Sequence, residues 1–334
     1  MQADAGHPGS SAPCARNIGW QHCIAGRARA DFNTHLEGNT VTVHESTTGH
    51  VRTAGLAGAS RRGLAGAVGA LVLLAGCASV HTTGSGTVGV DRTQYMSSLV
   101  PSASLDQEAD KQYRAIIDEA RSKKQLDVDP AQVRRVQAIT QRLIAQAPQF
   151  RPDAANWKWE VHVLSADEVN AWCMPGGKIA VYTGLLQQIK PTDAELAAVL
   201  GHEIAHALRE HARERVSQQM ATNLGLSVLS AVTGSSAASD LGGKLSEVMF
   251  TLPNSRTHET EADRMGVELA ARAGYDPAAA VTLWQKMGAA ASGNAPPEIL
   301  STHPSADSRI ADLRAASAQV MPLYRQAGGQ APAQ

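Results

Sequence analysis

The sequence predicts an α+β domain that is mainly helical and contains a small β-sheet, and three observations support this. Much of the chain after residue 104 places apolar residues at the three- and four-residue spacing of amphipathic helices. Between residues 157 and 183 the pattern changes to short alternating segments that are typical of strands. Aromatic residues make up 4% of the 334 residues and hydrophobic residues 43%, so we expect helices rich in alanine.

The overall charge argues against a nucleic-acid-binding protein. The formal net charge is −1 and the sequence has no long run of Lys or Arg, whereas nucleic-acid binding requires a basic patch. The four cysteines form no CxxC pair, so neither a zinc ribbon nor a disulfide framework is expected. A chain of this length suffices for one large or two modest hydrophobic cores.

The segment 61–77, RRGLAGAVGALVLLAGC, has the layout of a secretory signal: two arginines, a short apolar run and small residues at the end. The apolar run 63–75 is too short to span a bilayer core of about 30 Å. Its last four residues, LAGC, resemble the lipobox of bacterial lipoproteins, which implies cleavage before Cys77 and lipidation of that residue. The alternative is an ordinary signal peptide, residues 61–76, followed by an incidental cysteine.

Residues 1–60 form a doubtful leader, because they are long and polar for a signal peptide. One interpretation is that translation begins later, near Val51, and that much of this leader is never made. Ala78 follows the candidate lipidated cysteine, and by resemblance to lipoprotein sorting the absence of aspartate there favours the outer membrane. We therefore expect a lipid-anchored protein on the periplasmic face, in the outer membrane of a Gram-negative bacterium.

Residues 77–104 are rich in Ser, Thr, Gly and Val without a helical period, so we predict a flexible tether there. Two amphipathic helices are expected over residues 105–126 and 130–147, the second starting at the favourable pair Asp129-Pro130. Three strands follow, with a Pro-Gly-Gly turn before the last of them. Their expected ranges are 157–164, 170–174 and 178–183.

The remaining helices are expected to build most of the domain. Their predicted ranges are 192–219, 221–232, 257–273 (closed by Gly274), a helix after Asp276-Pro277, and 306–318. Loops are predicted at 233–243 and 290–297, and residues 326–334 are expected to form a disordered tail.

The segment 201–206, GHEIAH, carries an HExxH motif inside a strongly helical context. Four residues are slightly more than one helical turn, so His202 and His206 project from one face and can share a metal ion. Glu203 can reach a water on that metal, act as general base, and return the proton to the leaving amine.

A tetrahedral catalytic metal needs a third protein ligand, and the segment 255–263, SRTHETEAD, is the best source. Glu259 and Asp263 are four residues apart and face the same way, whereas Glu261 points elsewhere. Glu259 can bind the metal while Asp263 accepts a hydrogen bond from the far nitrogen of a ligating histidine. His258 is a competing candidate for the third ligand.

Together these two segments, GHEIAHALREH and SRTHETEAD, resemble the gluzincin metallopeptidases of peptidase family M48, which include the heat-shock protease HtpX and the CAAX prenyl protease. The similarity covers about residues 105–320, and the family's Asn-Ala-Phe reads Asn-Ala-Trp here. Further segments that fit are 170–172 with 175–177 and 183–186, 273–277, and 302–304 with 309–310.

The resemblance implies a gluzincin-type domain over residues 105–325 with one Zn²⁺ per chain. His202, His206 and Glu259 would be its ligands and Glu203 the catalytic base. The soluble Oma-like and periplasmic β-barrel assembly-enhancing branch fits best, because no apolar segment beyond the signal is long enough to span a membrane. The resemblance also suggests that 178–183 is an edge strand that aligns the substrate; the alternative is an ordinary paired strand without this role.

Two residues near the end of the domain have open roles. His303 either occupies the fourth metal position in a resting state or, like Arg309, stabilises the oxyanion of the tetrahedral intermediate. A third interpretation is a loop histidine whose hydrogen bonds are satisfied by water or the backbone. We favour the first role for His303. By contrast, His211 and His162 are expected to be structural.

The expected function is a zinc endopeptidase that cleaves unfolded or misassembled cell-envelope proteins. Its expected partners are polypeptide substrates, the membrane through a lipid anchor at Cys77, and the outer-membrane assembly machinery, with no nucleic acid. The alternative is a non-catalytic, chaperone-like or assembly-factor lipoprotein with the same fold. Two histidines and a carboxylate also suit divalent ions other than zinc.

Overall fold

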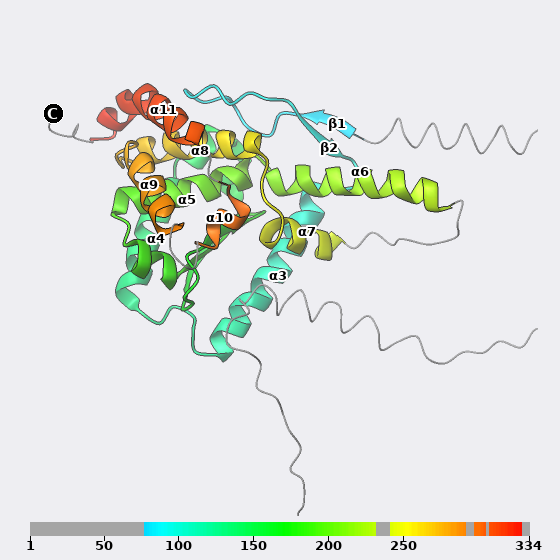
Figure 1. Ribbon diagram of the computed structural model, residues 1–334, viewed down its shortest axis with the longest axis horizontal. Coiled ribbons are helices and arrows are strands. Elements are labelled where there is room, and N and C mark those ends of the chain that lie inside the picture. The colour runs from blue at the N-terminus through cyan, green and yellow to red at the C-terminus, as the bar shows by residue number, and fades with distance from the viewer. Residues whose placement is uncertain (1–76, 232–240, 292–296, 305–306, 329–334) are drawn as a thin grey trace, which may run out of the picture. The chain divides into compact units, whose positions relative to one another are not determined.

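The computed structural model describes residues 77–231, 241–291, 297–304 and 307–328 (Figure 1). The leader 1–60, the signal peptide 61–76, most of the loops predicted at 233–243 and 290–297, and the end of the predicted tail lie outside the described residues. Among the described residues, no helix has the length and apolarity needed to cross a membrane.

The observed architecture confirms the predicted α+β class, with helices in the majority and two small sheets. The strands are β1 (Cys77–Val80), β2 (Gln94–Ser97), β3 (Glu160–Leu164), β4 (Ala171–Met174) and β5 (Lys178–Tyr182). The α-helices are α3 (Ser102–Ser122), α4 (Pro130–Ile144), α5 (Asp193–Leu208), α6 (His211–Ala231), α7 (Leu241–Phe250), α8 (Arg256–Arg272), α9 (Ala279–Ala291), α10 (Ile299–Thr302) and α11 (Asp307–Gln326).

Helices α5 and α8 lie side by side in the middle of the described residues (Figure 1). Helix α5 starts with a capping box. The side-chain hydroxyl of Thr192 accepts a hydrogen bond from the backbone N–H of Glu195, and the Glu195 carboxylate accepts one from the backbone N–H of Thr192. Nearly all of its residues are buried, because α4, α8, α9 and β4 pack around it. Helix α11 covers the other side of α8.

The two central helices touch through glycine. A Cβ atom on Gly266 of α8 would lie 2.7 Å from the backbone nitrogen of His202 and 2.9 Å from the carbonyl carbon of Gly201. A Cβ atom on Gly201 would lie 2.7 Å from the carbonyl oxygen of Gly266. Neither position has room for a side chain, so this pair of glycines sets the separation of the helices that carry the predicted metal ligands.

The three-stranded sheet has the order β3-β5-β4, with β5 parallel to β3 and antiparallel to β4. The expectation that residues 178–183 form an edge strand is therefore wrong, because β5 is the central strand and is buried along its length. The turn before β5 requires glycine: Gly177 has φ +82°, and a Cβ atom there would meet the Trp159 ring at 2.5 Å. The edge strand that packs against α5 is β4.

The structure differs from the flexible tether expected over residues 77–104. Strands β1 and β2 pair with each other, and the segment between them is bound to α8. The fully buried carboxylate of Glu268 accepts hydrogen bonds from the backbone nitrogens of Thr87 (2.8 Å) and Val88 (3.0 Å). In this chain, the polar segment without a helical period is therefore held by hydrogen bonds to residues that are distant in the sequence. We call residues 81–93 the N-terminal strap.

Several helix boundaries also differ from the predicted ones. The helix expected over 192–219 is broken after Leu208, and Glu210 adopts a left-handed conformation with φ +51° before α6 begins. The start of α7 falls at the end of the loop predicted at 233–243, and α11 runs to Gln326 rather than residue 318. Gly274, with φ +74°, closes α8 as predicted.

We predict that Gly266→Ala lowers the free energy of unfolding by about 1–3 kcal/mol, because the added methyl group must push α5 and α8 apart. Chemical denaturation of the variant measures this change. Gly288→Ala in α9 is the control, since a Cβ atom there has nothing within 4 Å, and it should stabilise by about 0.5–1 kcal/mol. Equal effects of the two substitutions would contradict the role given to the glycine contact.

Candidate metal centre

Helix α5 brings His202, Glu203 and His206 to its interface with α8. All three side chains are buried, and the Nε2 atoms of the two histidines lie 3.1 Å apart. The spacing of four residues thus places both imidazoles on one helix face, as predicted. Two imidazole nitrogens that face each other at this distance can bind the same cation.

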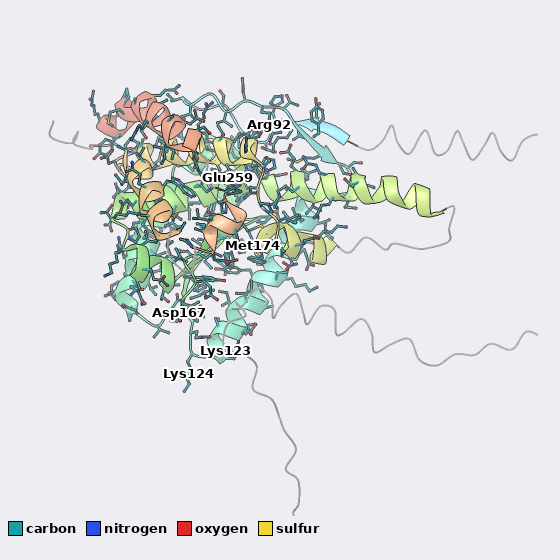
Figure 2. The ribbon with its side chains drawn as sticks, viewed as in Figure 1. Arg92, Lys123, Lys124, Asp167, Met174 and Glu259 are labelled. Atoms are coloured by element: carbon teal, nitrogen blue, oxygen red, sulfur yellow. The ribbon has the colours of Figure 1, made fainter. Side chains whose placement is uncertain are left out.

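Glu259 from α8 and His303, which follows α10, complete this group. One donor atom from each of His202, His206, Glu259 and His303 lies within 4.8 Å of the others, and all four residues are buried. Glu259 Oε1 is 3.4 Å from His206 Nε2 and 3.0 Å from His303 Nδ1. Figure 2 labels Glu259 among the side chains between the central helices.

The competing candidate His258 lies outside this group. Its Nε2 atom is 3.2 Å from a carboxylate oxygen of Glu214, and its ring stacks on that of His211 with centroids 4.3 Å apart. Neighbouring positions on α8 therefore face different surroundings, and Glu259 is the one that joins the two histidines of α5.

Asp263 and Arg309 hold the far side of His202. Asp263 Oδ1 is 2.9 Å from His202 Nδ1, which fixes the tautomer with Nε2 free toward the group of four. Arg309 donates to both oxygens of Asp263, at 2.6 and 2.7 Å, and makes an ion pair of 2.9 Å with Glu259 that lacks hydrogen-bond geometry. Its guanidinium also lies 3.4 Å above the Trp284 ring. Because Arg309 contacts both carboxylates, it holds Asp263 and Glu259 in position.

The pKa values of His206 and Glu259 are shifted in the directions that metal binding needs. The pKa of His303 is shifted the other way: burial alone would lower it, but the carboxylates of Glu259 and Glu203 outweigh burial and raise it. Burial lowers the pKa of His206 well below its usual value, which favours the neutral imidazole. Burial alone would raise the pKa of Glu259, but the neighbouring histidines, His303 foremost, outweigh it and lower that pKa well below its usual value. A neutral imidazole and an ionised carboxylate are the forms that coordinate a cation.

Glu203 differs from Glu259 in both pKa and contacts. Burial raises the pKa of Glu203, and among the described residues its Oε1 atom is buried without a hydrogen-bond partner. The nearest cationic candidate is His303 Nε2, at 3.6 Å. A buried, unpaired carboxylate oxygen is costly. It fits a site that receives a further group, and the four donors beside it fit a metal ion.

His211 has a contact that the sequence did not reveal. It was expected to be structural, yet its Nδ1 atom lies 2.8 Å from His206 Nδ1, on the side of that ring facing away from the group of four. His162, by contrast, is 2.6 Å from Asp127 and belongs to the region of β3, away from the site. The only sequence signal for His211 is its place five residues after His206.

Comparison with known proteins agrees with this geometry. The family model described as "Peptidase family M48" matches residues 130–317. The mitochondrial metalloendopeptidase OMA1 of Arabidopsis thaliana is 41% identical over 170 residues, which are 50% of this chain and 34% of that protein. The metalloendopeptidase OMA1 of Bos taurus is 38% identical over 190 residues, which are 53% of this chain and 36% of that protein.

A bacterial relative shows a similar extent of match. The beta-barrel assembly-enhancing protease of Escherichia coli K12 is 30% identical over 211 residues, which are 59% of this chain and 41% of that protein. The chain therefore spans between about a third and two fifths of the length of these three relatives.

We predict that His303→Ala raises the rate of casein cleavage severalfold while bound metal is retained, because three donors remain and the space beside Glu203 opens. A fluorogenic casein assay with metal analysis of each sample measures both. Ser301→Ala, an exposed neighbour, is the control and should leave both values unchanged. Slower cleavage with normal metal content would instead assign His303 to oxyanion stabilisation.

Proposed function

The chain belongs to peptidase family M48, and from this membership we propose that it is a zinc-dependent endopeptidase. The observation that carries the proposal is the buried group of His202, His206, Glu259 and His303 with Glu203 beside it, whose Oε1 atom has no hydrogen-bond partner among the described residues. Two imidazoles and one carboxylate from two helices are a donor set that zinc peptidases use.

In this proposal His202, His206 and Glu259 hold the zinc, and His303 occupies the fourth position at rest. When bound, the metal supplies Lewis acidity that polarises the scissile carbonyl and acidifies the attacking water. Glu203 takes the proton from that water and passes it to the amine that leaves. Its raised pKa suits this exchange, because a carboxyl group that titrates closer to neutral pH can both accept and return a proton.

The substrate would bind as an extended segment beside the sheet. Strand β4 is the edge strand that packs against α5, which makes it the strand on which an added peptide would lie closest to Glu203. Unfolded proteins supply such an extended segment along most of their length, whereas folded proteins supply it only in exposed loops and termini, so the proposed substrates are unfolded or misassembled polypeptides.

For localisation we propose a lipid anchor at Cys77 on the periplasmic side of the outer membrane. The lipobox-like LAGC at 74–77 supports the anchor. Among the described residues, the exposed large hydrophobic side chains are Tyr95, Leu99 and Val128, and the first two lie within two residues of Ser97, the β-ladder partner of Cys77. The Escherichia coli relative is named for enhancing β-barrel assembly, which supports clients and partners in outer-membrane β-barrel assembly.

We predict that Glu203→Gln retains stoichiometric zinc but reduces casein cleavage by at least 100-fold, because it removes only the proton acceptor. Metal analysis and a chelator-controlled cleavage assay on the same preparation measure the two quantities. Glu247→Gln, which alters an exposed carboxylate on α7, should cleave at the wild-type rate. Wild-type protein that binds zinc and a client but never cleaves would favour the chaperone-like alternative.

We predict that Cys77→Ser accumulates as an unprocessed precursor without lipid, because serine lacks the thiol that is acylated. Fractionation of native membranes and mass spectrometry of the mature N-terminus test this. Cys173→Ser, at a buried position on β4, is the matched control and should stay membrane-bound. Release of wild-type mature protein without detergent would rule out the anchor.

A further inference from the structure

We infer that His211 is a positioning residue for the metal centre, held in place by a chain of buried side chains that leads to the N-terminal strap. The inference rests on the proposed metal site and deepens it, because it concerns how His206 is fixed. Its basis is the contact of 2.8 Å between the Nδ1 atoms of His206 and His211.

The hydrogen atoms along this contact can be placed from the geometry. His206 Nε2 faces the other donors, 3.1 Å from His202 Nε2 and 3.4 Å from Glu259 Oε1. A metal bound by Nε2 leaves the proton of a neutral imidazole on Nδ1, which must then donate. His211 Nδ1 is therefore the acceptor.

The proton on His206 Nδ1 also determines where the proton of His211 lies. With Nδ1 accepting, neutral His211 carries its proton on Nε2, which lies 3.0 Å from Glu261 Oε2. His206 thus donates to His211, and His211 donates to the Glu261 carboxylate. Each proposed ligand of α5 is connected by hydrogen bonds to a carboxylate. His202 contacts Asp263 directly, whereas His206 is connected to Glu261 through the imidazole of His211.

The break between α5 and α6 makes this contact possible. Residues five apart do not face each other on a regular helix, where neighbours are three or four apart. Glu210, at φ +51°, redirects the chain so that the first residue of α6 turns back onto α5. The stacked ring of His258, inclined by 17°, covers one face of His211 and fixes its plane.

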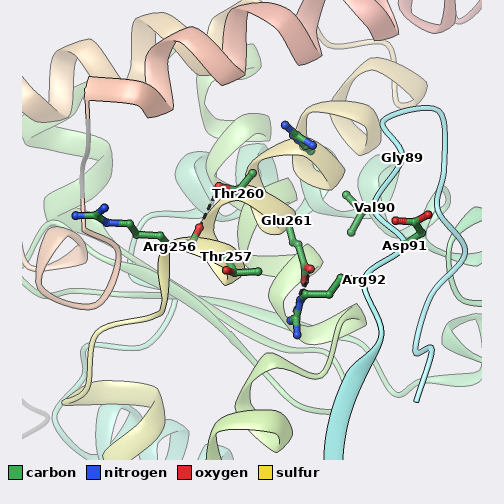
Figure 3. A pocket seen from close by; sticks show the side chains of 9 residues that line it. Gly89, Val90, Asp91, Arg92, Arg256, Thr257, Thr260 and Glu261 are labelled. Carbon is green, nitrogen blue, oxygen red and sulfur yellow. Dashed lines mark hydrogen bonds and ion pairs between the residues drawn. The ribbon is translucent and has the colours of Figure 1, made fainter. Parts of the chain in front are cut away.

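Two arginines hold Glu261 in turn. Arg209 donates to it from Nε at 3.1 Å and Nη2 at 3.0 Å. Arg92 of the N-terminal strap donates from Nε at 2.6 Å and also binds both oxygens of Glu214, at 2.7 and 2.8 Å. Figure 3 shows Arg92 reaching Glu261 beside a pocket of about 380 Å³. The chain of contacts therefore runs from the strap to His206.

The test measures metal affinity apart from catalysis. Zinc is titrated, in competition with a chromogenic chelator, into protein from which metal has been removed, and the melting temperature of the metal-free protein is recorded. We expect His211→Ala to weaken zinc binding by about 10–100-fold. Glu261→Gln should weaken it less, because the imidazole of His211 remains, and His211→Asn should recover part of the loss by restoring an acceptor for His206.

The matched control is Glu268→Gln. Glu268 is another buried carboxylate of α8, and it also binds the N-terminal strap. Among the described residues it contacts Thr87, Val88 and Arg272 rather than a histidine. It should lower the melting temperature without changing zinc affinity.

Two outcomes would overturn the inference. Unchanged zinc affinity in His211→Ala and Glu261→Gln would do so, as would equal losses of affinity in Glu261→Gln and Glu268→Gln. If His211→Ala does not fold, His211→Asn and Glu261→Gln still decide the question. Wild-type protein that binds no zinc would instead remove the proposed function, so the two failures are distinguishable.

Discussion

The close contact of α5 and α8 at Gly201 and Gly266 is the constraint on which the rest of the structure depends. A side chain at either glycine would clash with the backbone of the other helix, so the helices would have to move apart and the donors that they carry would move with them. Because backbone touches backbone there, His202 lies next to the crossing and Asp263 and Glu259 lie one and two turns before it on the partner helix. The remaining elements cover this pair of helices.

Such close packing of helices buries many charged side chains, and most of these buried charges have a partner of opposite charge. Arg309 binds Asp263 and Glu259 on one side of the centre, and Arg209 binds Glu261 on the other. Removing one member of such a group leaves its partner buried and unpaired, which costs more than the intact pair contributes. Among the described residues Glu203, by contrast, has no arginine partner of this kind, and its Oε1 atom accepts no hydrogen bond.

The sequence predicted the parts of the site that depend on local periodicity. His202, His206, Glu259 and Asp263 are spaced by four within two regular helices, and helical geometry alone places each pair on one face. The role of His211 could not be predicted in this way, because it depends on the left-handed residue Glu210 that interrupts the helix. The N-terminal strap was missed for another reason: its partner Glu268 is 181 residues from Thr87 in the chain, and composition gives no sign of such a contact. The central position of β5 likewise follows from strand order, which alternation does not specify.

If Cys77 carries the proposed lipid, its pairing within β1 limits where the proposed hydrolysis can occur. A flexible chain as long as residues 77–104 would let an attached domain sample a radius of about 30 Å around its anchor. Here that segment is folded, and the proposed lipid attachment point is itself part of a strand. The centre of hydrolysis would then stay at a nearly constant height above the bilayer. A client would have to approach the lipid surface to be cut, and proteins free in the surrounding compartment would be spared by distance rather than by their sequence.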